Sequence, residues 1–176
     1  MTTPVLILPG ISNSGPQHWQ TLWERRFPNF KRVQQSEWEA PECADWIANL
    51  DQAIAACAEP PVLVGHSAAC TLIGKWAEQH QRPVKGALLV APSDTEAASY
   101  PVEPTGFQPM STAKLPFPSI VVASSNDEYV TIERARQFAS NWGSDLVEIG
   151  AYGHINGNSG LGEWAQGLAL LKHLTD

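Results

Sequence analysis

Short apolar runs alternate with amphipathic stretches along the whole chain, and this alternation restricts the fold more than any other feature. The runs occupy 5–8, 61–64, 87–91 and 120–123, with weaker candidates at 31–35 and 145–149. Runs of β-branched residues and leucine of this length suit strands buried on both faces of a parallel sheet. Between them, apolar residues such as Trp19, Trp23 and Phe27 recur at helical spacing. Strand then helix, repeated about six times, predicts an α/β fold with a doubly wound parallel sheet and helices on both faces.

The length, charge and cysteine content of the chain predict its domain number, its redox state and the partners it lacks. The 176 residues fit one domain, 1–176, with a core that needs no disulfide. A net charge of −7, with 11 dispersed Lys and Arg, predicts no nucleic-acid partner. Three cysteines, Cys43, Cys57 and Cys70, lack C-x-x-C spacing and are expected to be reduced. The first apolar run stops at Pro9, too short for a signal segment or a membrane span, so we expect a cytoplasmic protein without a membrane partner.

The clearest chemical signal is the sequence Val-Leu-Val-Gly-His-Ser-Ala-Ala at 62–69. An apolar strand runs through Gly65-His66-Ser67 into a helical stretch, which is the context of a nucleophile elbow. The residues two before and two after the serine must be small, because strand and helix nearly touch there. Gly65 meets this requirement, and Ala69 replaces the more usual glycine with one extra methyl group. Ser67 is therefore the predicted nucleophile.

A serine hydroxyl needs a base, and the base needs an orienting acid, in the chain order Ser, acid, His on this fold. His154 follows Gly153 in a turn after the last candidate strand and is the predicted general base. The alternative is a loop histidine bonded to backbone. Asp127 follows the run at 120–123 and is the predicted acid, although an Asn-Asp turn also explains it. Glu128 and Asp94 are the rival carboxylates.

Backbone donors complete the predicted site. The N–H of Ala68, the residue after the nucleophile, supplies one donor of an oxyanion hole. A right-handed winding places the first strand beside the strand that leads to Ser67, so the second donor is expected from the loop after the first strand, at Ile11. This loop lacks the glycine spacing of a nucleotide-binding loop.

One long irregular segment, 92–118, is rich in proline and follows the carboxyl end of a strand. Segments of this kind either form part of a site or simply connect elements. We expect it to form one wall of a small pocket through Phe107, with His18 and Trp19 on the opposite side. Tryptophans at helical spacing are otherwise typical of helix-to-sheet packing.

Together these motifs resemble the small α/β-hydrolases of the retinoblastoma-binding-protein serine hydrolase family, bacterial type. The resemblance covers nearly the whole chain and is carried by Leu8-Pro9-Gly10, Asn13-Ser14, His18-Trp19-Gln20, Gly65-His66-Ser67, Ala91-Pro92, Ser125-Asn126-Asp127 and Gly153-His154-Ile155-Asn156. It implies a compact α/β-hydrolase fold: an all-parallel sheet of about six strands in the order 2-1-3-4-5-6, with no separate cap domain. It also implies the triad Ser67, Asp127 and His154. The animal member's L-x-C-x-E segment reads Ala-Ala-Cys-Ala-Glu here, so we expect no retinoblastoma-type pocket protein as partner.

The sequence therefore predicts a serine hydrolase that cleaves a small ester or amide through an acyl-enzyme. No metal or organic cofactor is implied, because the Cys, His and acidic residues show no zinc spacing. The alternatives are a non-catalytic interaction module that retains the fold and, with less support, a nucleotide or flavin binder.

Overall fold

The computed structural model describes residues 3–176. Within them, six strands form one sheet in the order β2-β1-β3-β4-β5-β6, with every neighbouring pair parallel. In chain order the elements are β1 (Val5–Leu8), α1 (Trp19–Arg26), β2 (Phe30–Arg32), α2 (Cys43–Ala55), β3 (Val62–His66), α3 (Ala68–Gln79), β4 (Gly86–Val90), β5 (Ser119–Ala123), α4 (Ile132–Trp142), β6 (Asp145–Glu148), a short 3₁₀ turn (Gly157–Ser159) and α5 (Ala165–Thr175). The predicted fold class and strand order are confirmed.

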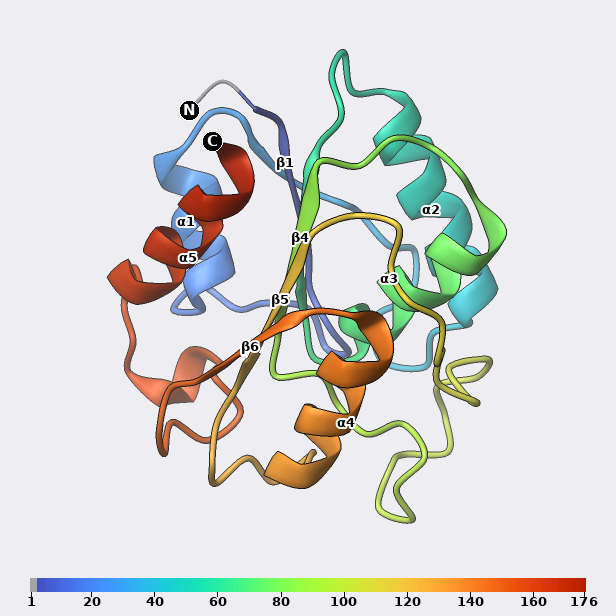
Figure 1. Ribbon diagram of the computed structural model, residues 1–176, viewed down its shortest axis with the longest axis vertical. Helices are drawn as coiled ribbons and strands as arrows, with labels where there is room; N and C mark the ends of the chain where they lie inside the picture. Colours follow the sequence, from blue (N-terminus) through green and yellow to red (C-terminus); the bar gives the residue numbers. More distant parts are fainter. Residues whose placement is uncertain (1–2) are drawn as a thin grey trace.

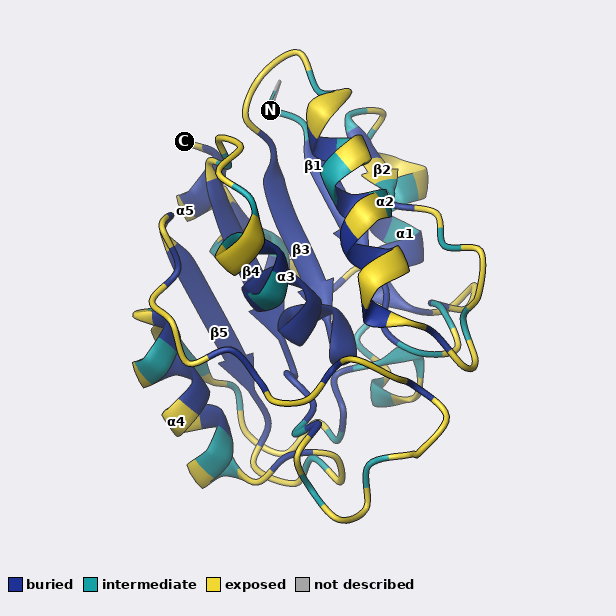
Figure 2. Ribbon diagram, turned by 90° about the vertical axis from the view of Figure 1, so that its right-hand side faces the viewer, coloured by how far each residue is buried: buried dark blue, intermediate teal, exposed yellow. Residues whose placement is uncertain are grey.

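Helices cover both faces of the sheet, α1 and α5 on one side and α2, α3 and α4 on the other (Figure 1). The strands separate two apolar layers because successive side chains point to opposite faces. Leu63 packs with the layer under α2 and α3, whereas its neighbours Val62 and Val64 pack with the layer under α1 and α5. All three side chains are fully buried, as is most of the central sheet (Figure 2). Burial on both faces explains the continuous apolar runs in the sequence.

Indole rings hold α1 and α5 against their side of the sheet. Trp19 lies edge-on to Trp23, with ring centroids 4.6 Å apart, and Trp164 stacks on Trp23 at 5.9 Å. The indole Nε1–H of Trp23 donates to the carbonyl of Glu163 at 2.7 Å, so its polar atom is satisfied within the apolar layer. These tryptophans are packing residues, as their helical spacing predicts.

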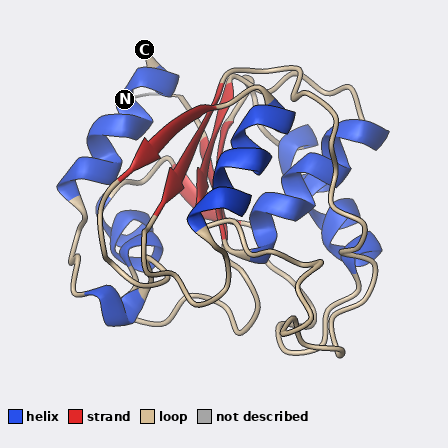
Figure 3. Ribbon diagram, turned by 60° about the horizontal axis from the view of Figure 1, so that its bottom comes forward, coloured by secondary structure: helices blue, strands red, loops and turns tan. Residues whose placement is uncertain are grey.

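All strands run in one direction, so the loops that leave their carboxyl ends gather along one edge of the sheet (Figure 3). The segment between β4 and β5 lies at this edge and contains neither helix nor strand, apart from an isolated bridge between Thr105 and Glu42. The expected boundaries hold to within a residue or two, except that β2 is only three residues long and stops at Arg32. Within residues 3–176, no helix is both long enough and apolar enough to cross a bilayer.

The buried central strand predicts a large loss of stability on truncation. Leu63 has no exposed surface, and Leu63→Ala is expected to lower the free energy of unfolding by about 2–5 kcal/mol, because it leaves a cavity between sheet and helices. Val102→Ala is the control, since Val102 is 87% exposed and its truncation should change stability by less than about 0.5 kcal/mol. Urea denaturation measures both. Equal losses in the two variants would contradict this placement of the core.

Candidate active site

Ser67 occupies the tight turn between β3 and α3. Its backbone angles, φ 60° and ψ −126°, are sparsely populated for a residue with a side chain. The turn is held by its own N–H, which donates to the carbonyl of Val90 at the end of β4 (3.0 Å). A Cβ at Gly65 would lie 2.8 Å from Ile73 and 3.3 Å from the carbonyl of Ala69, so strand and helix touch here. This is the geometry that the sequence predicts for an elbow, and it leaves the side chain of Ser67 partly exposed.

The loop after β1 comes into contact with this turn. A Cβ at Gly10 would lie only 2.8 Å from the Cβ of Ser67 and 3.0 Å from the carbonyl of His66. This approach places Ile11, the predicted second donor, among the residues that line the cavity around Ser67. The backbone N–H groups of Ile11 and Ala68 have no hydrogen-bond acceptor within residues 3–176. Two donors are therefore available beside the serine.

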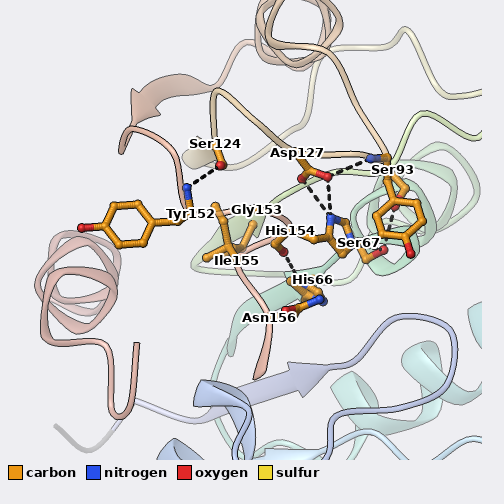
Figure 4. Close-up of polar contacts among 12 residues, drawn as sticks. His66, Ser67, Ser93, Ser124, Asp127, Tyr152, Gly153, His154, Ile155 and Asn156 are labelled. Carbon is orange, nitrogen blue, oxygen red and sulfur yellow. Dashed lines mark hydrogen bonds and ion pairs between the residues drawn. The ribbon is translucent and has the colours of Figure 1, made fainter. Parts of the chain in front are cut away.

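A chain of hydrogen bonds joins Ser67, His154 and Asp127 (Figure 4). The Nε2 atom of His154 lies 2.9 Å from Ser67 Oγ, and its Nδ1 lies 2.9 and 2.8 Å from the two carboxylate oxygens of Asp127. A carboxylate only accepts, so Nδ1 carries a proton, and in the neutral ring Nε2 accepts the hydroxyl proton of Ser67. The Asp127 side chain has no exposed surface and also accepts the N–H of Tyr129 (2.9 Å). The carboxylate is thus fixed from two sides.

The loops that carry Asp127 and His154 are tied to each other. The Oδ1 atom of Asn126 accepts both the hydroxyl of Ser124 (3.0 Å) and the backbone N–H of Gly153 (2.7 Å). The Ser124 hydroxyl also accepts the N–H of Tyr152 (2.9 Å). The turn after β5 and the turn after β6 are therefore joined by hydrogen bonds, which hold the imidazole and the carboxylate in position.

The rival carboxylates have other surroundings. Asp94 forms an ion pair with Arg134, whose Nε and Nη2 atoms lie 2.7 and 2.8 Å from its two oxygens. Glu128 is exposed and lies at the rim of a neighbouring hollow. Of the three acids considered from the sequence, Asp127 is the one that the structure places on His154.

Two further histidines support the site as neutral rings. The Nε2–H of His66 donates to the backbone carbonyl of His154 at 2.9 Å, and the two rings lie 4.8 Å apart. Burial, followed by the charges of His154 and His18, holds the pKa of His66 well below its usual value. Burial, followed by the charges of Arg32 and His154, lowers the pKa of His18 to about 3. Sequence reasoning missed the role of His66, although its place beside the nucleophile was a usable signal.

A cavity of about 600 Å³ opens over Ser67, and the residues that line it include no Asp, Glu, Lys or Arg. His18 lines it, as predicted. The prediction for Trp19 and Phe107 is wrong, since both are 1% exposed and lie outside this lining. Trp19 packs against Trp23 and donates its indole N–H to the carbonyl of Ile155 (2.8 Å), and Phe107 packs edge-on against Trp46. Both rings bury their apolar surface in the core, which the sequence could not distinguish from a pocket wall.

The segment after β4 reaches the cavity through other residues. Tyr100 and Pro101 line it, and so does Ser93, whose hydroxyl oxygen lies 2.7 Å from Ser67 Oγ. Tyr129 adds an aromatic ring 4.5 Å from the ring of His154. Sequence reasoning missed both Ser93 and Tyr129. Ser93 follows the end of a strand, as Asp127 does, but a lone serine there carries no distinctive pattern.

A comparison with protein families shows which family this chain belongs to. The family model described as serine hydrolase matches residues 5–173, a range that includes Ser67, Asp127 and His154. The chain belongs to the serine hydrolase family. Family membership confirms the resemblance drawn from the motifs and makes this chain a hydrolase enzyme. No group of three or more His, Cys, Asp or Glu side chains within residues 3–176 is arranged to hold a metal ion.

Solved structures agree with this assignment. The chain is similar to a YdeN-like hydrolase from Pectobacterium atrosepticum, with 31% identity, a TM-score of 0.88, and coverage of 99% of this chain and 91% of that one. The ydeN gene product of B. subtilis shares 19% identity, with a TM-score of 0.76 and 99% coverage of both chains. A monoacylglycerol lipase from Paleococcus ferrophilus shares the fold, with 12% identity, a TM-score of 0.71, and coverage of 99% and 96%. No curated protein matches significantly.

The contact between the two loops of this serine hydrolase predicts that Gly10→Ala impairs the site. The added Cβ would lie 2.8 Å from the Cβ of Ser67, so either the loop or the serine must move. The rate of labelling by a fluorophosphonate probe is expected to fall about tenfold or more, because small displacements of reacting groups are costly. Gly15→Ala is the control in the same loop, since nothing lies within 4 Å of its added methyl group. Equal labelling rates in both variants would show that the approach of Gly10 does not constrain Ser67.

Proposed function

We propose that the protein hydrolyses a small ester or amide through an acyl-enzyme, with Ser67 as nucleophile, His154 as general base and Asp127 as the orienting acid. The observation that carries this proposal is the hydrogen-bonded chain from Asp127 through His154 to Ser67 Oγ. It ends at a partly exposed hydroxyl at the floor of a cavity. This combination of nucleophile, base and orienting group is what activation of a serine requires.

In acylation, Ser67 Oγ bonds to the carbonyl carbon of the substrate while its proton passes to His154 Nε2. The carbonyl π electrons move to the oxygen, and the negative charge there is met by the N–H groups of Ile11 and Ala68. When this intermediate collapses, the bond to the leaving group breaks and the proton on Nε2 passes to that group. The acyl group remains on Ser67.

Deacylation repeats these steps with water as the nucleophile. His154 takes a proton from the water as it attacks the acyl carbon, and it returns a proton to Ser67 Oγ as the ester bond breaks. Asp127 keeps the proton on Nδ1 throughout and stabilises the imidazolium. His66 and His18 stay neutral because their pKa values are lowered, so they place no second positive charge beside this imidazolium.

The cavity supports a small substrate. Its volume of about 600 Å³ lies within the range typical of sites for small molecules. Gln17 and Asn158 are both exposed and line it from two adjacent loops, and Tyr100 and Pro101 line the side formed by the segment after β4. We therefore expect esters with short acyl chains to be hydrolysed faster than esters with long acyl chains.

Ser67→Ala tests the central assignment. This variant is expected to lose both ester hydrolysis and labelling by a fluorophosphonate probe, because the probe reacts only with an activated serine. Ser125→Ala is the control, since Ser125 is exposed and lies two residues from Asp127. Retained labelling in Ser67→Ala would place the nucleophile elsewhere. A wild-type protein that the probe never labels would favour a non-catalytic interaction module.

The adjacent carboxylates provide a test of the acid. Asp127→Asn is expected to lower kcat by about 10⁴-fold, as loss of tautomer control does in serine proteases. Glu128→Gln should change kcat little, because Glu128 is exposed and the carboxylate that bonds to His154 is that of Asp127. Steady-state kinetics on one ester give both values. If Glu128→Gln proved the more damaging change, the carboxylate would be wrongly assigned.

A further inference from the structure

Ser93 lies against the proposed nucleophile without belonging to the triad. Its Oγ is 2.7 Å from Ser67 Oγ, and the residue is 4% exposed. Within residues 3–176, the Ser93 hydroxyl makes no other hydrogen bond. The Ser93 hydroxyl is therefore buried and bonds to one atom, Ser67 Oγ, which is the atom proposed to attack the substrate (Figure 4).

The backbone on both sides of Ser93 is fixed. The N–H of Ala91 donates to the carbonyl of Val122 in β5 at 2.8 Å, and the N–H of Asp94 donates to the carbonyl of Tyr129 at 3.0 Å. Tyr129 in turn donates its own N–H to Asp127. The segment that carries Ser93 is therefore anchored to the segment that carries the proposed acid, and its hydroxyl has a defined position relative to the triad.

The direction of the hydrogen bond between Ser93 and Ser67 follows from the two hydrogen bonds that His154 makes to Asp127 and Ser67. Asp127 accepts the proton on Nδ1 of His154, so Nε2 of the neutral ring is an acceptor. Nε2 then accepts the hydroxyl proton of Ser67, and this proton is no longer available to Ser93. Ser93 must therefore donate to Ser67 Oγ.

We propose that Ser93 is a catalytic residue whose hydroxyl donates to Ser67 Oγ and stabilises the charge that develops on this atom. The inference rests on the proposed function. As the proton of Ser67 passes to Nε2 during attack, electron density rises on Oγ, and a donor is already in place there. In deacylation the bond between the acyl carbon and Oγ breaks, the electron pair returns to Oγ, and the same donor meets it. Ser93 keeps its own proton throughout.

If the Ser93 hydroxyl stabilises charge on Ser67 Oγ in both half-reactions, Ser93→Ala should slow both acylation and deacylation. p-Nitrophenyl trimethylacetate is a suitable probe, because its hindered acyl group leaves slowly. Release of p-nitrophenolate under excess enzyme gives the acylation rate, and loss of the acyl adduct from the intact protein, followed by mass spectrometry, gives the deacylation rate. Each rate is expected to fall about 10- to 100-fold, as for the loss of one hydrogen bond to a charged atom. Ser93→Thr, which keeps a hydroxyl, should restore much of both rates.

The chain supplies a matched control for the loss of a buried serine pair. Ser119, the first residue of β5, is 5% exposed and does not line the cavity. Its Oγ lies 2.6 Å from the Oγ of Ser144. Ser119→Ala removes the same kind of bond and should leave both rates unchanged. Melting temperatures of the variants check that each is folded.

Two outcomes would overturn the role of Ser93. Unchanged rates in folded Ser93→Ala would show that the donor is not used. A slower acylation alone would show that Ser93 only orients the free hydroxyl, since in the acyl-enzyme Oγ is held by its covalent bond. A wild-type protein that forms no acyl adduct and takes no fluorophosphonate label is a different result: it would remove the proposed function, and this inference with it.

Discussion

The turn at Ser67 is the constraint on which the rest of the molecule depends. The chain must change from β3 to α3 within one residue, and it does so at a backbone conformation that costs about 1–3 kcal/mol for a residue with a side chain. The surroundings hold that strain in place. Gly65 lets the strand touch the helix, and Gly10 lets the loop after β1 press against the turn. The carbonyl of Val90 accepts the backbone N–H of Ser67 and so ties the turn to the end of β4. The two neighbours of β3 in the sheet, β1 and β4, therefore both contribute to holding the turn at Ser67.

In the proposed mechanism, the surroundings of His154 must accommodate a positive charge on its ring. When this imidazole takes up a proton, Asp127 is the charged group that faces it, at 2.8 Å. The neighbouring rings of His66 and His18 are kept neutral by burial. His66 also fixes the backbone of His154 by donating to its carbonyl. His154 is therefore the one of these three histidines that contacts both Ser67 and Asp127, and the other two add no charge beside it.

Most of the fold and the chemical centre could be predicted from the sequence, because both depend on local patterns. Apolar runs and helical spacing predicted about six parallel strands, and the family resemblance supplied their order. The positions after strand ends predicted Ser67, Asp127 and His154, which the structure places together. The cavity wall could not be predicted in the same way. Phe107 and Tyr100 lie in one irregular segment, yet Phe107 turns into the core and Tyr100 toward the cavity. That choice is made by long-range packing, against Trp46 in the case of Phe107, which no local pattern records. Ser93 was missed for a similar reason, since its meaning comes from a neighbour distant in sequence.

The segment after β4 is anchored at its beginning, so the part of it that lines the cavity can change in sequence more freely than the part beside Ser67. Residues 91–94 are tied to β5 and to the loop of the acid, whereas 98–103 are largely exposed and still reach the cavity through Tyr100 and Pro101. Lengthening an exposed loop costs little free energy, about 0.6 kcal/mol for each doubling. New side chains and even insertions at 98–103 can therefore reshape what enters the cavity while the reacting atoms stay where they are.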